Sequence, residues 1–312
     1  MTTATSTPTD SHSRRYRESL ENAQKVNWRI EDIIGGDRTL DFSRPFLPEG
    51  LARVSGMDYL NQQEKRTLNQ IRANTYLCIF GLVEEFILPF VMDHARPHLS
   101  GDDWRTRALL QFASEEAKHI QLFKRFKEEF EAGFGVRCDV IGPAEEIARA
   151  VLSHHPLSVA LVILHIEWMT QRHYVSAVKD EPSLDPQFMS LLKHHWQEEA
   201  QHSKLDALMV ESLGERCTPE EIDAALDGYL AIGGMLDAGL LQQVGLDMDA
   251  FQRATGRTLT EKEREAFTSI QLQANRWTYL GSGMTHPKFL ESLGMLKAGA
   301  REKIEAVAPA FV

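Results

Sequence analysis

The chain has 312 residues, of which 34 are Lys or Arg and 45 are Asp or Glu, so its formal net charge at pH 7 is −11. With 43% hydrophobic and 25% charged residues, it has the composition of a globular protein and not of a collagen-like or mostly disordered chain. An acidic protein is repelled by anionic partners, so we expect neither nucleic acid nor a membrane surface among its partners.

The three cysteines, Cys78, Cys138 and Cys217, are too few and too scattered for a disulfide framework or a zinc site made of thiolates. The sequence opens with a polar stretch rich in Thr and Ser instead of a secretory segment. We therefore predict a disordered tail over residues 1–20 and a cytoplasmic location. Apolar runs such as residues 159–164 are shorter than a membrane span, which predicts a protein without a membrane segment.

Helical periodicity dominates from residue 61 onwards, and the alternation that marks strands is scarce. Four long helices are predicted, over about 61–95, 101–135, 155–182 and 185–214. Asp102 or Asp103 can cap the second helix, and Pro156 lies in the first turn of the third. Pro89 lies inside the first helix, where it predicts a kink or an irregularity.

Helix signals continue after the fourth helix. Thr218 and Thr260 each precede acidic residues in the pattern of a helix start, and Pro287 opens the last predicted helix. Because no linker rich in Pro, Gly or Ser intervenes, we predict a single all-α domain over residues 21–312. It would consist of a four-helix bundle over about 61–214 and extra helices over about 218–308.

A six-residue motif occurs in both the second and the fourth predicted helix. Ser-Glu-Glu-Ala-Lys-His ends at His119, and Gln-Glu-Glu-Ala-Gln-His ends at His202, 83 residues later (202 − 119). In each copy a glutamate, Glu116 or Glu199, precedes the histidine by three residues, so both side chains can reach one metal ion from the same helix face. Two near-identical copies are a much stronger signal than one.

The first and third helices carry glutamates at the same offset. Glu84 and Glu167 are also 83 residues apart (167 − 84), and each lies within an apolar run. Glu85 is the alternative to Glu84, which we prefer because it shares its helix face with an apolar stripe. Four buried carboxylates need cations, and oxygen and imidazole ligands without thiolates suit Fe or Mn.

A third imidazole makes the predicted site asymmetric. His195 lies four residues before Glu199 on the same face, whereas the first half has Phe112 at the matching position. We predict His195 as a metal ligand, and the alternative is a core histidine that hydrogen-bonds a ligand glutamate. Glu115 and Glu198 lie about 100° away from the ligand face and are predicted to contact helix neighbours or solvent.

From about residue 61 to its C-terminus, the chain resembles the di-iron arylamine N-oxygenases of the p-aminobenzoate N-oxygenase type. The repeated Glu-x-x-His motifs with their partner glutamates are the frame of ferritin-like di-iron and di-manganese proteins, and His195 points to this subfamily. The resemblance implies terminal ligands Glu84 and Glu167, bridging ligands Glu116 and Glu199, and nitrogen ligands His119, His202 and His195.

The resemblance implies an O₂-dependent di-iron monooxygenase that acts through a peroxo-diferric species on an amine of a small-molecule substrate, such as an arylamine. The cofactor would be two Fe ions, with Mn as the alternative metal, and the metal ligands would be the whole catalytic machinery. The sequence carries no flavin or nicotinamide motif, so an external electron donor is expected, either a reductase or a ferredoxin. A homodimer is the expected assembly.

Two other functions use the same ligands. One is a di-iron hydroxylase or desaturase that acts on a C–H bond, because the fold alone does not select the substrate. The other is a ferroxidase or iron-storage protein. The roughly one hundred residues after the predicted bundle argue against the latter, since a cage subunit does not need them.

Overall fold

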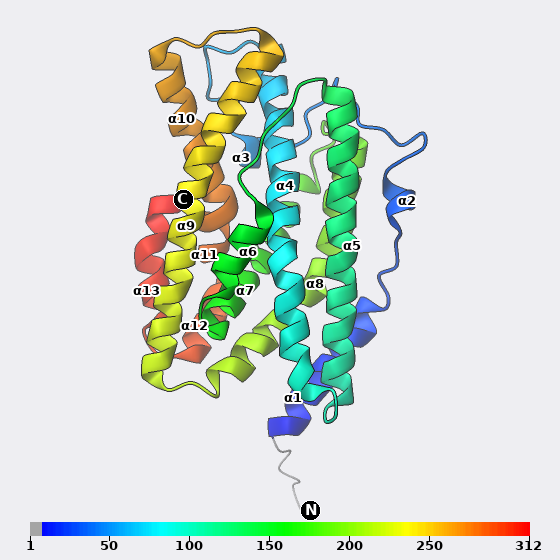
Figure 1. Ribbon diagram of the computed structural model, residues 1–312, viewed down its shortest axis with the longest axis vertical. Helices are drawn as coiled ribbons and strands as arrows, with labels where there is room; N and C mark the ends of the chain where they lie inside the picture. Colours follow the sequence, from blue (N-terminus) through cyan, green and yellow to red (C-terminus); the bar gives the residue numbers. More distant parts are fainter. Residues whose placement is uncertain (1–7) are drawn as a thin grey trace, which may run out of the picture.

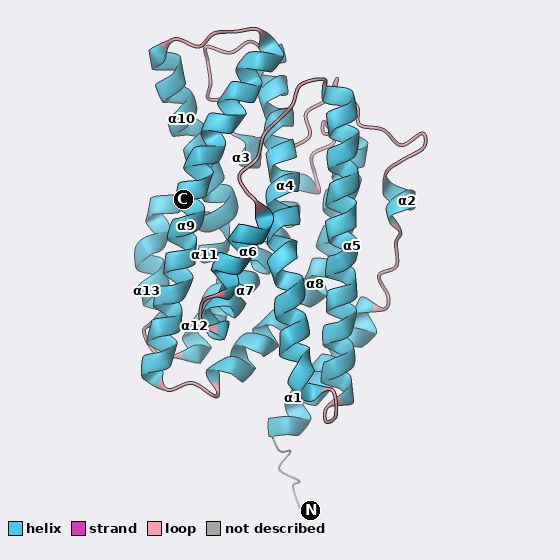
Figure 2. Cartoon of the chain, viewed as in Figure 1, coloured by secondary structure: helices cyan, strands magenta, loops and turns pink. Residues whose placement is uncertain are grey.

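The chain is a bundle of helices in the computed structural model, which describes residues 8–312, and this range contains no strand (Figure 1, Figure 2). The prediction of an all-α bundle is confirmed. Four long helices form its core: α4 (Gln62–Ala95), α5 (Asp103–Phe134), α7 (Pro156–His173) and α8 (Pro186–Gly214). The π-helical turn η2 (Tyr174–Val178) extends α7.

The core helices begin at the residues that their sequences suggest. Asp102 caps α5 by accepting a hydrogen bond from the Arg105 amide, and α5 ends at Gly135, whose φ of 76° is in the left-handed region that favours glycine. Asn61 and Glu64 form a capping box at the start of α4. Pro89 lies inside α4, which is helical on both sides of it.

The C-terminal third of the chain packs on one side of the core. Helix α9 (Pro219–Thr255) contacts both α4 and α7, and α10 (Glu261–Arg276) packs against α9. Pro287 opens α12 (Pro287–Leu296), which is not the last helix as predicted, because α13 follows. The smaller elements here are η3 (Trp277–Gly281), α11 (Ser282–Met284), α13 (Ala300–Val307) and η4 (Ala308–Phe311).

Shorter elements connect and cover the core. Between α5 and α7, the chain crosses α4 and forms α6 (Ala144–Leu152), as Figure 1 shows. The short elements elsewhere are α2 (Ile30–Ile33), α3 (Glu49–Ala52) and η1 (Arg96–His98).

The N-terminal region corrects the prediction of a disordered tail over residues 1–20. Residues 8–20 belong to helix α1 (Pro8–Ala23), and residues 1–7 lie outside the described part of the chain. Tyr16 and Leu20 are buried, and α1 packs against α5 and α8. Arg15 also donates a hydrogen bond to Glu211 of α8 over 2.6 Å. These apolar residues are spaced four apart, as a helix requires, but the polar residues between them hide the pattern.

Two helices have the length and the hydropathy of a membrane span: Gln62–His98, which joins α4 and η1, and α9. This corrects the expectation that every apolar stretch falls short of a span. The most apolar window of the first helix is 56% buried, and that of the second is 28% buried. Length and composition are weak signals here, because the core helix of a soluble protein meets the same criteria.

Candidate metal centre

All seven side chains predicted as metal ligands are buried where the four core helices face one another. Helix α4 supplies one, α5 two, α7 one and α8 three. Each side chain is at most 3% exposed, although all of them are ionisable. The seven residues are Glu84, Glu116, His119, Glu167, His195, Glu199 and His202.

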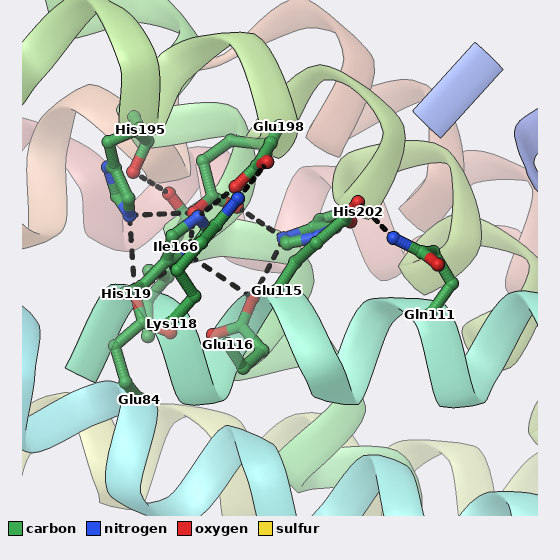
Figure 3. A network of polar contacts seen from close by, with 12 residues as sticks. Glu84, Gln111, Glu115, Glu116, Lys118, His119, Ile166, His195, Glu198 and His202 are labelled. Carbon is green, nitrogen blue, oxygen red and sulfur yellow. Dashed lines mark hydrogen bonds and ion pairs between the residues drawn. The ribbon is translucent and has the colours of Figure 1, made fainter. Parts of the chain in front are cut away.

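Six of the seven form two overlapping groups, within each of which the potential ligand atoms lie within 4.8 Å of one another (Figure 3). The first group is Glu84, His119, His195 and Glu199, and the second is Glu116, His119, Glu199 and His202. His119 and Glu199 belong to both groups. Two adjacent ion positions that share ligands are therefore built into the core of the bundle.

The distances between nitrogen and oxygen atoms match those between ligands of a common ion. His202 Nδ1 lies 2.7 Å from Glu116 Oε1 and 2.8 Å from Glu199 Oε2. His195 Nε2 lies 2.6 Å from Glu199 Oε1 and 3.2 Å from Glu84 Oε1. Two donors bound at about 2.1 Å and at right angles to each other on one ion are about 3 Å apart, so these pairs are spaced for shared coordination.

Glu84 and its alternative Glu85 have different surroundings. Glu84 is 2% exposed and belongs to the first group. Glu85 is 35% exposed and lies 3.7 Å from Lys124 of α5 in an ion pair. The helix phase thus directs Glu84 to the centre and Glu85 towards the surface.

Glu167 lies beside the two groups and is not a member of either. It is 2% exposed, and Glu199 and His202 of α8 are among the groups whose charges affect its pKa. No partner for Glu167 Oε2 is found among the described residues. Because this oxygen is buried and forms no hydrogen bond within residues 8–312, it is available to an ion bound near His202.

Several polar atoms of the centre lack a hydrogen-bond partner within residues 8–312. They are both carboxylate oxygens of Glu116, Glu84 Oε2, Glu199 Oε1 and His119 Nδ1. Buried polar atoms are normally satisfied, and this cluster combines carboxylate oxygens with imidazole nitrogens, the donors preferred by Fe and Mn. The centre is therefore able to bind two metal ions.

The first glutamate of each repeated motif bonds the histidine of the other motif. Glu198 Oε2 lies 2.8 Å from His119 Nε2, and Glu115 Oε2 lies 2.8 Å from His202 Nε2. Both glutamates are buried, so the predicted contact with solvent is wrong. The predicted contact with a helix neighbour is found for Glu115, which accepts a hydrogen bond from Gln111, but the contacts with the histidines were not predicted. A carboxylate on one ring nitrogen holds the imidazole so that the other nitrogen can bind metal.

A third layer of side chains supports this carboxylate layer. The Lys118 ammonium contacts Glu198 Oε1 over 2.5 Å and lies 3.7 Å from the centre of the Trp28 ring. Trp28 in turn stacks on the His119 ring, with centroids 6.1 Å apart and an interplanar angle of 7°. On the other side, Gln111 donates a hydrogen bond to Glu115 over 2.8 Å. Each carboxylate thus bonds a histidine with one oxygen and another polar side chain with its second oxygen.

Aromatic rings cover the sides of the centre. Phe112 stacks on His202 at a centroid distance of 4.0 Å, which explains why the first half has a phenylalanine where the second has His195. The rings of Phe80 and Phe123 stand edge-on to His195, with centroids 5.7 and 5.0 Å from it. This apolar surface excludes water and strengthens the electrostatic interactions inside.

The carboxylates and imidazoles change one another's pKa values. Burial alone would lower the pKa of His119, but the carboxylates of Glu199 and Glu198 outweigh it and raise the pKa to about 9. Burial also opposes a charge on His202. The carboxylates of Glu199 and Glu116 outweigh this effect, so the pKa of His202 lies well above its usual value. Burial and the nearby charge of Glu199 raise the pKa of Glu167 well above its usual value.

These shifts predict that metal binding releases protons. The raised pKa values of His119 and His202 favour their charged forms in the metal-free protein, and the raised pKa of Glu167 favours its protonated form, so metal binding must release protons from these side chains. Metal affinity should consequently rise as the pH increases towards 9. Calorimetry of Mn(II) binding to metal-free protein, in buffers with different ionisation enthalpies, measures this release. A binding enthalpy that is the same in every buffer would contradict the prediction.

The carboxylate layer predicts a loss of metal affinity in Glu198→Gln. The glutamine keeps the size of the side chain but removes the charge that holds His119, and losses of this kind weaken metal binding about 10- to 100-fold. Competition with a chelator measures the affinity. Glu265→Gln, an exposed residue of α10 outside every group of potential metal ligands, is the control. Equal affinities in the two variants would show that Glu198 does not support the centre.

Comparisons with known proteins give no family for this chain. No family model matches, and no curated protein matches. Among solved structures, an R2-like ligand-binding oxidase mutant with an aerobically reconstituted Fe/Fe cofactor is 13% identical, with a TM-score of 0.43 over 83% of this chain and 91% of that chain. A mutant with an anaerobically reconstituted Mn/Fe cofactor is also 13% identical, with a TM-score of 0.45 over 85% and 92%. Similarity at this level decides neither the fold nor the activity, which rest on this chain's own helices and side chains.

Proposed function

We propose that this protein is a non-haem di-iron oxygenase that N-oxygenates an amine of a small-molecule substrate. The observation that carries the proposal is the pair of overlapping Glu/His groups, with His195 added on one side only. The asymmetry supports an enzyme in which the two ions have different tasks. The choice of an amine comes from the resemblance to the arylamine N-oxygenases.

Each ligand has a definite role in the proposal. Glu199, which contacts all three histidines, would link the two ion positions. The resemblance gives Glu116, which lies 2.7 Å from His202, the role of a second bridging ligand. Glu84 and His195 complete one position, and Glu167 completes the other once it has lost its proton. When bound, the two iron ions supply the activation of O₂.

The overall reaction determines how many electrons an external donor must supply. Conversion of an amine to a hydroxylamine inserts one oxygen atom into an N–H bond, and the second atom of O₂ leaves as water. This balance needs two electrons and two protons beyond the substrate. We therefore also propose an external electron donor, a reductase or a ferredoxin. A homodimer and a cytoplasmic location complete the proposal.

Anaerobic loading with Fe(II), metal analysis and rapid mixing with O₂ test this function. We expect about two iron ions per chain, an optical transient that decays faster when 4-aminobiphenyl is present, and an oxygenated amine in the product by mass spectrometry. Mössbauer spectra of the frozen samples would report the state of the iron. Conversion of the iron to ferric mineral would show a ferroxidase instead, and a failure to bind metal would overturn the proposal.

A further inference from the structure

The largest of three cavities formed by residues 8–312 has a volume of about 810 Å³ and lies along the seam between α4 and α5. The segment of residues 135–144, which leads from α5 to α6 across α4 in Figure 1, forms its third wall. Its volume falls within the range of about 300–1,000 Å³ that is usual for small-molecule sites.

The inner end of this cavity lies one helical turn from the metal centre. Gly81 lines the cavity and precedes Glu84 by three residues on α4, while Phe123 lines it and follows His119 by four residues on α5. One turn of helix is about 5.4 Å. The ring of Phe123 separates the cavity from His195, whose ring centroid is 5.0 Å away. The first ligand group is therefore directly behind the cavity wall.

The other two cavities do not suit a substrate of this centre. One, of about 380 Å³, meets α4 at Asn69, which is 15 residues before Glu84 and thus about 22 Å away along the helix. The other touches Ile166, next to Glu167, but its volume is only about 40 Å³. Of the three cavities, the one between α4 and α5 is both large enough for a small-molecule substrate and close to the metal centre.

The lining of the seam cavity indicates what it would bind. Leu77, Leu82 and Phe123 give its inner part an apolar surface. The three cations at its rim each lie close to an acid that also lines the cavity: Lys124 with Glu85 at 3.7 Å, Lys127 with Glu131 at 3.7 Å and Arg137 with Asp139 at 2.7 Å. The rim charges thus balance one another and offer no surplus charge to an ion.

We propose that the cavity between α4 and α5 is the substrate site and that its ligand is an uncharged molecule with an apolar body. This inference rests on the proposed function. The apolar body of the ligand would contact Leu77, Leu82 and Phe123. A carboxylate on the ligand would have to compete with the acids of the rim.

Binding of 4-aminobiphenyl to the metal-free protein, followed by calorimetry, tests the location of the site. Gly81→Leu and Cys138→Phe each place a larger side chain in the cavity, and each should weaken binding by about tenfold or more. A Cβ at position 81 would lie 3.4 Å from Phe123 Cβ, at the short end of ordinary contact distances. Cys217→Phe, which lies outside the cavity, is the control and should bind as the parent does.

Unchanged binding in both cavity-filling variants would overturn the proposed location. Because the protein is metal-free in this assay, the result does not depend on the proposed oxygenase activity. The same two variants should also retain the metal content of the parent. Loss of ligand binding in variants that still bind metal supports the proposed substrate site. Failure of the parent protein to bind metal would refute the proposed function, but it would not change the result of the binding assay.

The charge of the ligand is tested with a matched pair of molecules. We expect 4-aminobiphenyl to bind at least as tightly as 4′-aminobiphenyl-4-carboxylate, which has the same body and an added negative charge. Tighter binding of the carboxylate by tenfold or more would overturn the assignment of an uncharged ligand. Equal or weaker binding of the carboxylate supports it.

Discussion

Glu199→Ala is expected to empty both metal positions, reducing the metal content from about two ions per chain to almost none. The reason is its place in the centre: Glu199 belongs to both ligand groups, with one oxygen 2.6 Å from His195 and the other 2.8 Å from His202. No other carboxylate within residues 8–312 is part of both groups. Metal analysis after anaerobic Fe(II) loading and desalting measures the change, and turnover should disappear with the metal.

Two further variants make this result specific. Glu199→Gln preserves the size of the side chain and should also lose both ions, which separates loss of a ligand from loss of packing. Glu85→Ala removes a carboxylate next to a predicted ligand but outside the centre, so it should keep two ions. A folded Glu199→Ala protein that retained both ions would show that the shared position does not bind metal.

The sequence was sufficient for the fold class and for identifying six residues whose potential ligand atoms lie close together in the core. Repeats at a constant offset identify corresponding points on separate helices, and the 83-residue spacing did so for Glu84 and Glu167 without any knowledge of packing. Helix phase then separated Glu84 from Glu85, since the apolar stripe marks the face that is buried. Both arguments depend on properties of long regular helices, which tertiary contacts seldom override.

The same reasoning failed for Glu115 and Glu198. Glu115 and Glu198 point about 100° away from the ligand face of their own helices, so neither contacts a ligand on its own helix. In this direction each carboxylate reaches the histidine of the facing helix. The signal was present in the sequence, because these two glutamates are also 83 residues apart (198 − 115). Trp28 carried no comparable signal, since its contact with His119 depends on how a non-repeated segment packs on the bundle.

His195→Ala tests the asymmetry on which the proposed function depends. The variant should lose the ion held by Glu84 and His195 and retain the one near Glu116 and His202, so the metal content should fall from about two ions to about one. In Mn(II)-loaded protein, the spin-coupled signal of an ion pair should give way to the six-line spectrum of an isolated ion. This readout does not require turnover.

His194→Ala is the matched control for this prediction. His194 is adjacent in sequence, but it is half-buried, bonds the backbone of Ser190 over 2.7 Å and lies against the edge of Trp28 instead of the centre. It should retain the coupled pair of ions. If His195→Ala also retained the pair, His195 would be a core histidine hydrogen-bonded to Glu84, and the two ion positions would have equivalent ligands. The argument for different tasks at the two positions would then fail, although the centre itself would remain.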